Sequence, residues 1–276
     1  MNNYDFFNRE EIYLCSHLFR LLHENINSKD GALGRLLSIL SSVKSKLYDE
    51  IVNFSGKSFE NIGIFCEAAL IRDKYKDLLE MDKYDKLKPN VEDFMDNLVC
   101  LLMEHYKIID DCRKYSELNE KRLKTIYPGR IRQKAEDMGV HLSENEKMIY
   151  KEIQKLFYSS PDLLITIDNY LIVIEAKFTQ SFSKDQLNRT KLIAEIWAKL
   201  LYKDLGFCSS PNYIVYKLGK MCKHADKNKG ADISWDNIYE IAQEFYPEDD
   251  RSLIAFERCL EHLKHNTGNI IQENVG

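Results

Sequence analysis

The stretch PDLLITIDNYLIVIEAK, residues 161–177, decides how the rest of the chain is interpreted. It contains two apolar runs, 163–167 and 171–174, whose length and composition are typical of buried strands. Between the runs, Asp168-Asn169 has the chemistry of a tight turn. The stretch therefore predicts a β-hairpin.

Charged residues stand at the two ends of this hairpin. A two-residue turn at Asp168-Asn169 places Asp162 opposite Glu175, and a turn one residue later places it opposite Lys177. Because side chains alternate between the two faces of a strand, both registers put Asp162, Glu175 and Lys177 on one face. A carboxylate or an ammonium is costly to bury unless it is paired or bound. The three charges are therefore either a solvated strand end with an ion pair or a site.

The site interpretation has a definite chemistry. Two neighbouring carboxylates repel each other when both are ionised, and a divalent cation removes that repulsion. Oxygen ligands favour Mg²⁺ or Mn²⁺ over Zn²⁺, and no Cys or His lies nearby in the hairpin. A lysine beside such an ion can hold or deprotonate an attacking water, or offset charge in a phosphoryl transition state.

Pro161-Asp162, followed by Glu175-Ala176-Lys177 on the next strand, resembles the motif of the PD-(D/E)XK nuclease superfamily. The resemblance covers roughly residues 143–218. It implies an α/β fold with a restriction-endonuclease-like core, a central mixed sheet flanked by helices, and Mg²⁺-dependent hydrolysis of DNA. In that family the two acids bind the metal and the lysine assists hydrolysis, roles that we carry to Asp162, Glu175 and Lys177. The family core usually has an earlier strand, which residues 126–142 would have to supply here or which is missing.

The family often has a further acid on its first core helix. Glu67 is a candidate because IFCEAALI, residues 64–71, places it among apolar residues of one helical face. Its structural alternative is a buried ion pair with an arginine. Glu146 and Glu152 are rival candidates for the same role.

Gln186 and Arg189 lie three residues apart in the helix expected after the hairpin, so they share a helical face. They are candidates for contacts with water or phosphate near the metal. The structural alternative for Gln186 is strong, because Ser183 and Gln186 have the spacing of a capping box.

Two groups of basic residues are candidates for nucleic-acid contacts. KRLKTIYPGRIRQK, residues 121–134, contains no acid, and Arg130, Arg132 and Lys134 in it could follow a phosphate backbone. A lysine-rich segment from Lys217 to Lys229 follows the last expected strand. A solvated linker and an ordinary lysine-rich loop are the alternatives.

The distribution of apolar residues along the chain suggests two domains. Residues 7–118 have helical periodicity, with helices expected over 31–52 and 58–80 among others. We therefore expect a large N-terminal helical region, 1–125, and a nuclease-like domain, 126–276. Within the second domain, Ser143 and Glu146 form a capping box that should begin a helix. The two hairpin strands, a helix, a strand over PNYIVYKLG and two helices split near Pro247 should follow.

Composition narrows the class of protein. The net charge of -5 argues against a basic coat for non-specific DNA binding. No signal peptide and no apolar run long enough to span a membrane are seen, and the 7 scattered cysteines indicate reduced thiols, so a cytoplasmic protein without membrane contact is expected.

Three hypotheses follow, with a homodimer left open in each. The first is a Mg²⁺-dependent nuclease acting on DNA in restriction, repair or phage defence. The second is an inactive nuclease-like module that binds nucleic acid or regulates a partner. The third places function in the helical half, residues 1 to about 120, as a protein-interaction scaffold.

Overall fold

The computed structural model describes residues 3–24, 26, 28–57, 62–82, 91–108, 130–139, 141–178, 182–220 and 230–272, without the side chains of 3–11 and 262–272. The elements, in chain order, are α1 (Asn3–His23), α2 (Ala32–Ser42), β1 (Gly63–Cys66), α3 (Leu70–Asp82), α4 (Val91–Tyr106), α6 (Ile131–Asp137), α7 (Glu144–Phe157), β2 (Leu163–Ile167), β3 (Tyr170–Ala176), α8 (Lys184–Leu200), β4 (Asn212–Gly219), β5 (Ile233–Ser234), α9 (Trp235–Phe245) and α10 (Arg251–Gln272). Among these elements, no helix is long and apolar enough to cross a membrane. The α/β class expected from the sequence is confirmed.

Five strands form one mixed sheet in the order β1-β2-β3-β4-β5. β1 and β3 are antiparallel to β2, whereas β4 is parallel to β3 and β5 is parallel to β4. The hairpin pairs Ile167 with Tyr170 and Leu163 with Ile174, which is the register of a two-residue turn at Asp168-Asn169. Asp168 has φ 47, a left-handed conformation that Asp tolerates better than most residues. The expected hairpin and the first of its two expected registers are confirmed.

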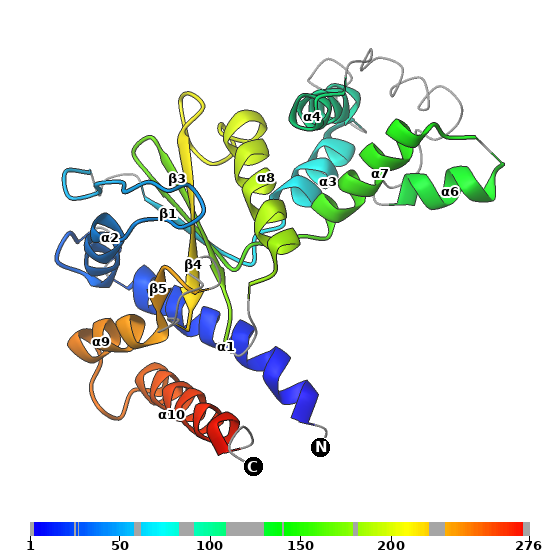
Figure 1. Cartoon of the computed structure of the whole chain (residues 1–276). Helices are drawn as coiled ribbons and strands as arrows, with labels where there is room; N and C mark the ends of the chain where they lie inside the picture. Colours follow the sequence, from blue (N-terminus) through cyan, green and yellow to red (C-terminus); the bar gives the residue numbers. More distant parts are fainter. Residues whose placement is uncertain are drawn as a thin grey trace. The chain divides into compact units, whose positions relative to one another are not determined.

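Alternate residues of these strands face two different surroundings. One face, called here the apolar face, buries Leu163, Ile165, Ile167, Ile172, Ile174, Ala176, Ile214, Tyr216 and Leu218 together with residues of α1, α2, α9 and α10. α8 covers the other face, called here the α8 face (Figure 1). All residues of β2 are buried, which explains why this strand is apolar except for Thr166 and does not alternate.

The first strand of the sheet comes from an unexpected place. The sequence predicted one continuous helix over residues 58–80, but β1 occupies Gly63–Cys66 and α3 begins only at Leu70. β1 pairs along β2, with Cys66 opposite Leu163. The helical prediction was wrong because four residues are too few to show a strand pattern, and the helical periodicity of α3 continued through them. The strand that precedes the hairpin is therefore present, and the described part of 126–142 forms α6 instead.

The chain forms two compact units, of which the first is made of residues 1–68, 161–194 and 205–276. The second is made of residues 69–160 and 195–204. In sequence, most of the second unit is thus an insertion between β1 and β2. The expected boundary near residue 125 lies outside the described residues, and the expected helical region 1–125 contains β1 as well as α1 to α4.

Several helix boundaries follow the local signals in the sequence. Ser143 caps α7 in a complete capping box with Glu146, as expected. α9 and α10 are split around Pro247, also as expected. α2 is shorter than the predicted helix over residues 31–52, because it ends at Ser42 and the chain from Lys44 onward turns back through a bridge between Ser45 and Glu50.

Candidate functional site

The site begins with a row of residues at one end of the sheet. The paired residues of the strands end at Cys66–Leu163 and Leu163–Ile174, and one further step along the same register places Glu67 beside Asp162 and Asp162 beside Glu175. The parallel pair of β3 and β4 sets Glu175 opposite Lys217. Neighbouring strands lie about 4.8 Å apart, so adjacent members of this row are close. We call these four residues, Glu67, Asp162, Glu175 and Lys217, the strand-end row.

Asp162 is bound to both of its neighbouring strands. Its carboxylate Oδ2 accepts a hydrogen bond of 2.7 Å from the Ala176 N–H at the end of β3. Its backbone carbonyl accepts one of 3.2 Å from the Glu67 N–H just after β1. Asp162 thus lies at the point where the first three strands meet, which its place in the hairpin register requires.

Glu175 is a buried carboxylate, only 6% exposed, and is held by helix α8. The Gln186 side-chain amide donates to its Oε1, and the Thr190 hydroxyl donates to its Oε2 over 3.0 Å. The Lys177 ammonium lies 3.9 Å from Oε1. These contacts place Glu175 and Lys177 together on the α8 face, whereas Ala176 between them packs in the apolar core, as the alternation predicted.

Glu67 lies in this region, but its local structure differs from the helix that the sequence predicted. It does not lie on a helical face with apolar neighbours: it follows β1 directly, has φ 51 and is exposed. The argument from burial was therefore wrong, although the residue lies beside Asp162. The pKa of the Cys66 thiol is raised to about 11, mainly by burial and further by the charges of Glu67 and Asp162.

The rival acids Glu146 and Glu152 have local partners. Glu146 accepts the Ser143 N–H over 2.6 Å within the capping box, and Glu152 forms a 2.5 Å ion pair with Lys155. Both belong to the second unit, whereas the strand-end row belongs to the first.

Gln186 combines the two roles between which the sequence left a choice. Its backbone N–H is capped by the Ser183 hydroxyl over 3.1 Å, but its side chain binds Glu175 and does not close the capping box. Arg189 is half-buried one turn further along α8, and the guanidinium makes no ion pair with any side chain in the described ranges. α8 thus contributes Gln186 directly to the site.

The basic residues Arg130, Arg132 and Lys134 lie in the second unit, at and within α6. Arg130 precedes the helix, and Lys134 lies 3.9 Å from Asp137. Among the residues that the structure describes, none accepts a hydrogen bond from the buried Nε of Arg132. The preceding part of the basic run, 121–129, lies outside the described residues. The same holds for 221–229 in the later lysine-rich segment.

Two residues near Glu175 were not predicted. Thr190 is 3% exposed and donates to Glu175, and Lys217 is 1% exposed within β4. The sequence interpretation had assigned Lys217 to a lysine-rich loop after the strand. The stretch PNYIVYKLG, residues 211–219, contained a signal for Lys217. A lysine within an otherwise apolar strand must either lie at an edge of the sheet or bind a buried partner.

The donor set of the strand-end row consists of oxygen. Cys66 is partly buried and packs against the apolar core, and burial raises the pKa of its thiol. Across the described part of the chain, no three or more side chains of Asp, Glu, His and Cys are grouped tightly enough to hold a metal ion. Asp162, Glu175 and Glu67 are thus neighbours by strand register without forming a compact cluster of three ligands.

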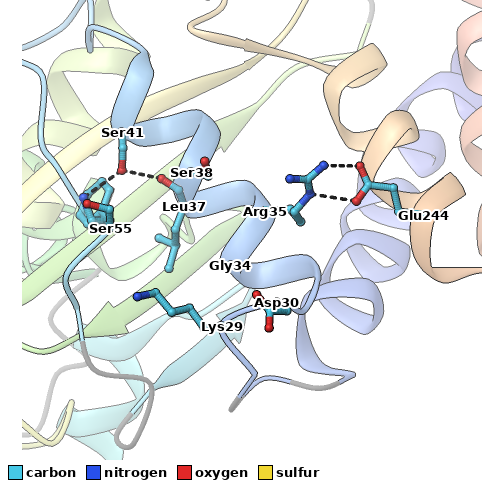
Figure 2. A pocket seen from close by; sticks show the side chains of 10 residues that line it. Lys29, Asp30, Gly34, Arg35, Leu37, Ser38, Ser41, Ser55 and Glu244 are labelled. Carbon is cyan, nitrogen blue, oxygen red and sulfur yellow. Dashed lines mark hydrogen bonds and ion pairs between the residues drawn. The ribbon is translucent and has the colours of Figure 1, made fainter.

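A separate hollow of about 500 Å³ lies beside α2, and Figure 2 shows its lining. It is lined by Lys29, Asp30, Gly34, Arg35, Leu37, Ser38, Ser41, Phe54, Ser55 and Glu244. Arg35 and Glu244 bind each other through two hydrogen bonds of 2.8 and 2.6 Å, and the Ser41 hydroxyl links Leu37 to Phe54. No member of the strand-end row contributes to this hollow.

Comparison of the chain with protein-family models, with curated proteins and with solved structures finds no match.

Proposed function

We propose that the chain is a divalent-metal-dependent nuclease that hydrolyses phosphodiester bonds in DNA. The observation that carries the proposal is the convergence of Asp162, Glu175 and Lys177 at one end of a buried hairpin. Such charges in a largely apolar sheet are costly for stability, and their position at the strand ends fits a site better than a structural ion pair.

The residues present fit a hard divalent cation. Asp162 and Glu175 would hold it, and the exposed side chain of Glu67 is the candidate for a third ligand. Two carboxylates are enough for Mg²⁺, which commonly keeps several waters and takes its remaining ligands from substrate phosphate. When bound, the ion polarises a phosphoryl oxygen and makes a bound water more acidic.

The side chains of the protein account for the remaining steps. Lys177, 3.9 Å from Glu175, is placed to orient an attacking water, to take its proton, or to offset charge on the phosphoryl oxygens in the transition state. Gln186 and Thr190 keep the Glu175 carboxylate in one orientation. Arg189, one turn after Gln186, is proposed to contact a phosphate of the DNA backbone.

The arrangement of the strands supports the PD-(D/E)XK type of core. The resemblance requires a strand before the hairpin, and β1 provides an antiparallel one. It also requires a helix and a closing strand after the hairpin, which α8 and the parallel strand β4 provide. We accordingly propose a restriction-endonuclease-like core with the second unit inserted after its first strand, and a role in restriction, repair or phage defence.

One observation favours a second candidate function, an inactive nuclease-like module that binds nucleic acid or a partner. The Glu175 oxygens both accept side-chain hydrogen bonds, and Asp162 Oδ2 accepts a backbone N–H. These bonds would also stabilise the carboxylates in a purely structural role.

The two candidates are separated by a cleavage assay with Mg²⁺ or Mn²⁺ on supercoiled plasmid, linear duplex, single-stranded DNA and RNA of the same sequence. Asp162→Asn should reduce cleavage by at least about 100-fold, since it removes a charge that acts on the reacting groups. Asp168→Asn is the matched control, because Asp168 lies in the turn of the same hairpin and outside the site. Equal cleavage by both variants would contradict the nuclease proposal. Nucleic-acid binding without cleavage, unaffected by Asp162→Asn, would favour the binding module.

A further inference from the structure

Lys217 is the one cation of the strand-end row. It lies in β4 directly opposite Glu175 of β3, and it is 1% exposed. Its side chain is therefore out of reach of a DNA substrate, so any effect that it has on the site must pass through another residue.

Three observations place Lys217 on the same side of the sheet as Glu175. The residues that flank it, Tyr216 and Leu218, belong to the apolar core, so Lys217 faces away from that core. Its ammonium lies 5.5 Å from the centre of the Phe182 ring, just before α8. Glu175 binds α8 through Thr190 on that same side.

A buried ammonium requires compensation by negative charge. Two buried carboxylates are near Lys217: Glu175 by register, and Asp232 by a hydrogen bond. Asp232 Oδ2 accepts the Lys217 backbone N–H over 2.9 Å, and Oδ1 accepts the Lys46 backbone N–H over 3.1 Å. Burial raises the pKa of the Asp232 carboxyl, and the charge of Lys217 also acts on it, with a smaller lowering effect. Glu175, which faces Lys217 across the strand pair, and Asp232 are therefore rival partners of this ammonium.

We propose that Lys217 is a positioning residue of the candidate active site, a buried cation that holds the Glu175 carboxylate in place from the neighbouring strand β4. This inference rests on the proposed nuclease function for its catalytic meaning. Its structural content, an energetic coupling between Lys217 and Glu175, does not depend on that function. The two lysines then differ in role: Lys177 lies at the strand end near the substrate, and Lys217 acts through Glu175.

The coupling is tested by two double-mutant cycles in the full chain, with the unfolding equilibrium measured in denaturant. One cycle combines Lys217→Met with Glu175→Gln, and the other combines it with Asp232→Asn. We expect a coupling of at least about fivefold in the unfolding constant in the first cycle, and a smaller one in the second. Additivity in the first cycle, or a coupling confined to the second, would overturn the proposal. If Lys217→Met does not fold, Lys217→Gln takes its place in both cycles.

A second readout is Mn²⁺ affinity, measured by titration at a temperature where each variant is folded. Lys217→Met should weaken Mn²⁺ binding by about tenfold or more, because residues behind a ligand control its orientation. Lys46→Met is the matched control: the Lys46 ammonium binds the Ala231 carbonyl over 2.5 Å, and its backbone bond to Asp232 is retained. Equal Mn²⁺ affinity in Lys217→Met and wild type would count against a positioning role.

Absence of cleavage by the wild type would instead refute the nuclease function while leaving the stability cycles interpretable.

Discussion

The two faces of the sheet are built from alternate residues of the same strands, yet they bury different chemistry. On the apolar face, Ile172 and Ile174 of β3 pack among aliphatic and aromatic side chains. On the α8 face, the next residue, Glu175, is bound by Gln186, Thr190 and Lys177. Burial on the apolar face serves stability, whereas buried charge on the other face costs stability and, in the proposed nuclease, would hold the metal and assist hydrolysis. Variants on the two faces should therefore differ in what they lose, cleavage rate or stability.

Lys177→Met should have the largest effect and should act on the rate alone. Loss of a group that assists proton transfer lowers rates by about 10²- to 10⁴-fold, so initial cleavage of plasmid should fall by that factor. The melting temperature should stay near that of the wild type. Lys184→Met, at the exposed first residue of α8, is the control and should retain activity. A loss of stability without loss of rate would assign Lys177 to a structural ion pair.

Ile172→Ala should lower stability and leave the cleavage rate unchanged. Ile172 is fully buried on the apolar face, and truncation of such a residue lowers the free energy of unfolding by about 2–5 kcal/mol. Denaturant unfolding measures this loss, and cleavage per folded molecule should remain at the wild-type level. A rate loss comparable to that of Lys177→Met would remove the distinction between the two faces.

Thr190→Val tests the hydrogen bond from α8 to the second oxygen of Glu175. The substitution keeps the shape of the buried side chain and removes its hydroxyl donor, so the free energy of unfolding should fall by about 1–3 kcal/mol. Thr190→Ser retains the donor and should recover part of this loss. Identical unfolding curves for the two variants would show that the hydroxyl contributes nothing to holding Glu175.

The smallest effect is expected at Cys66. Its pKa is raised to about 11, by burial and by the charges of Glu67 and Asp162, so alkylation by iodoacetamide should increase with pH toward that value. Glu67→Gln removes one negative charge, which lowers the pKa of the thiol and should speed alkylation at pH 9 on the order of threefold, about half a pKa unit. The exposed Cys208 in the same molecule is the internal control. An unchanged rate at Cys66 would argue that Glu67 does not face the site.

Local patterns in the sequence predicted the hairpin and the capping box of α7 correctly, and they limited the hairpin to two registers, of which the structure has the first. Each depends on residues close together in the chain: a two-residue turn sets the pairing, and Ser143 and Glu146 need only each other. The same logic predicted that Glu175 and Lys177 would share a face.

Long-range features were missed for an equally physical reason. β1 has only four residues and pairs with a strand that begins at Leu163, so nothing local distinguishes it from the start of α3. Thr190 and Lys217 have ordinary neighbours in the sequence, and only the packing of α8 and β4 against β3 brings them to Glu175. Sequence reasoning reached Glu67 through an argument from burial that the structure contradicts.

The position of β1 has a consequence for the order of folding. The hairpin of β2 and β3 closes a two-residue turn, whereas β1 must close a loop of about a hundred residues to reach β2. Contacts between distant segments form late, so the hairpin is expected to precede the docking of β1. Asp162 and Glu175 would then be placed early, and Glu67 would arrive with the last strand to pair. While the chain is being synthesised, the strand-end row would therefore lack Glu67 until β1 has docked.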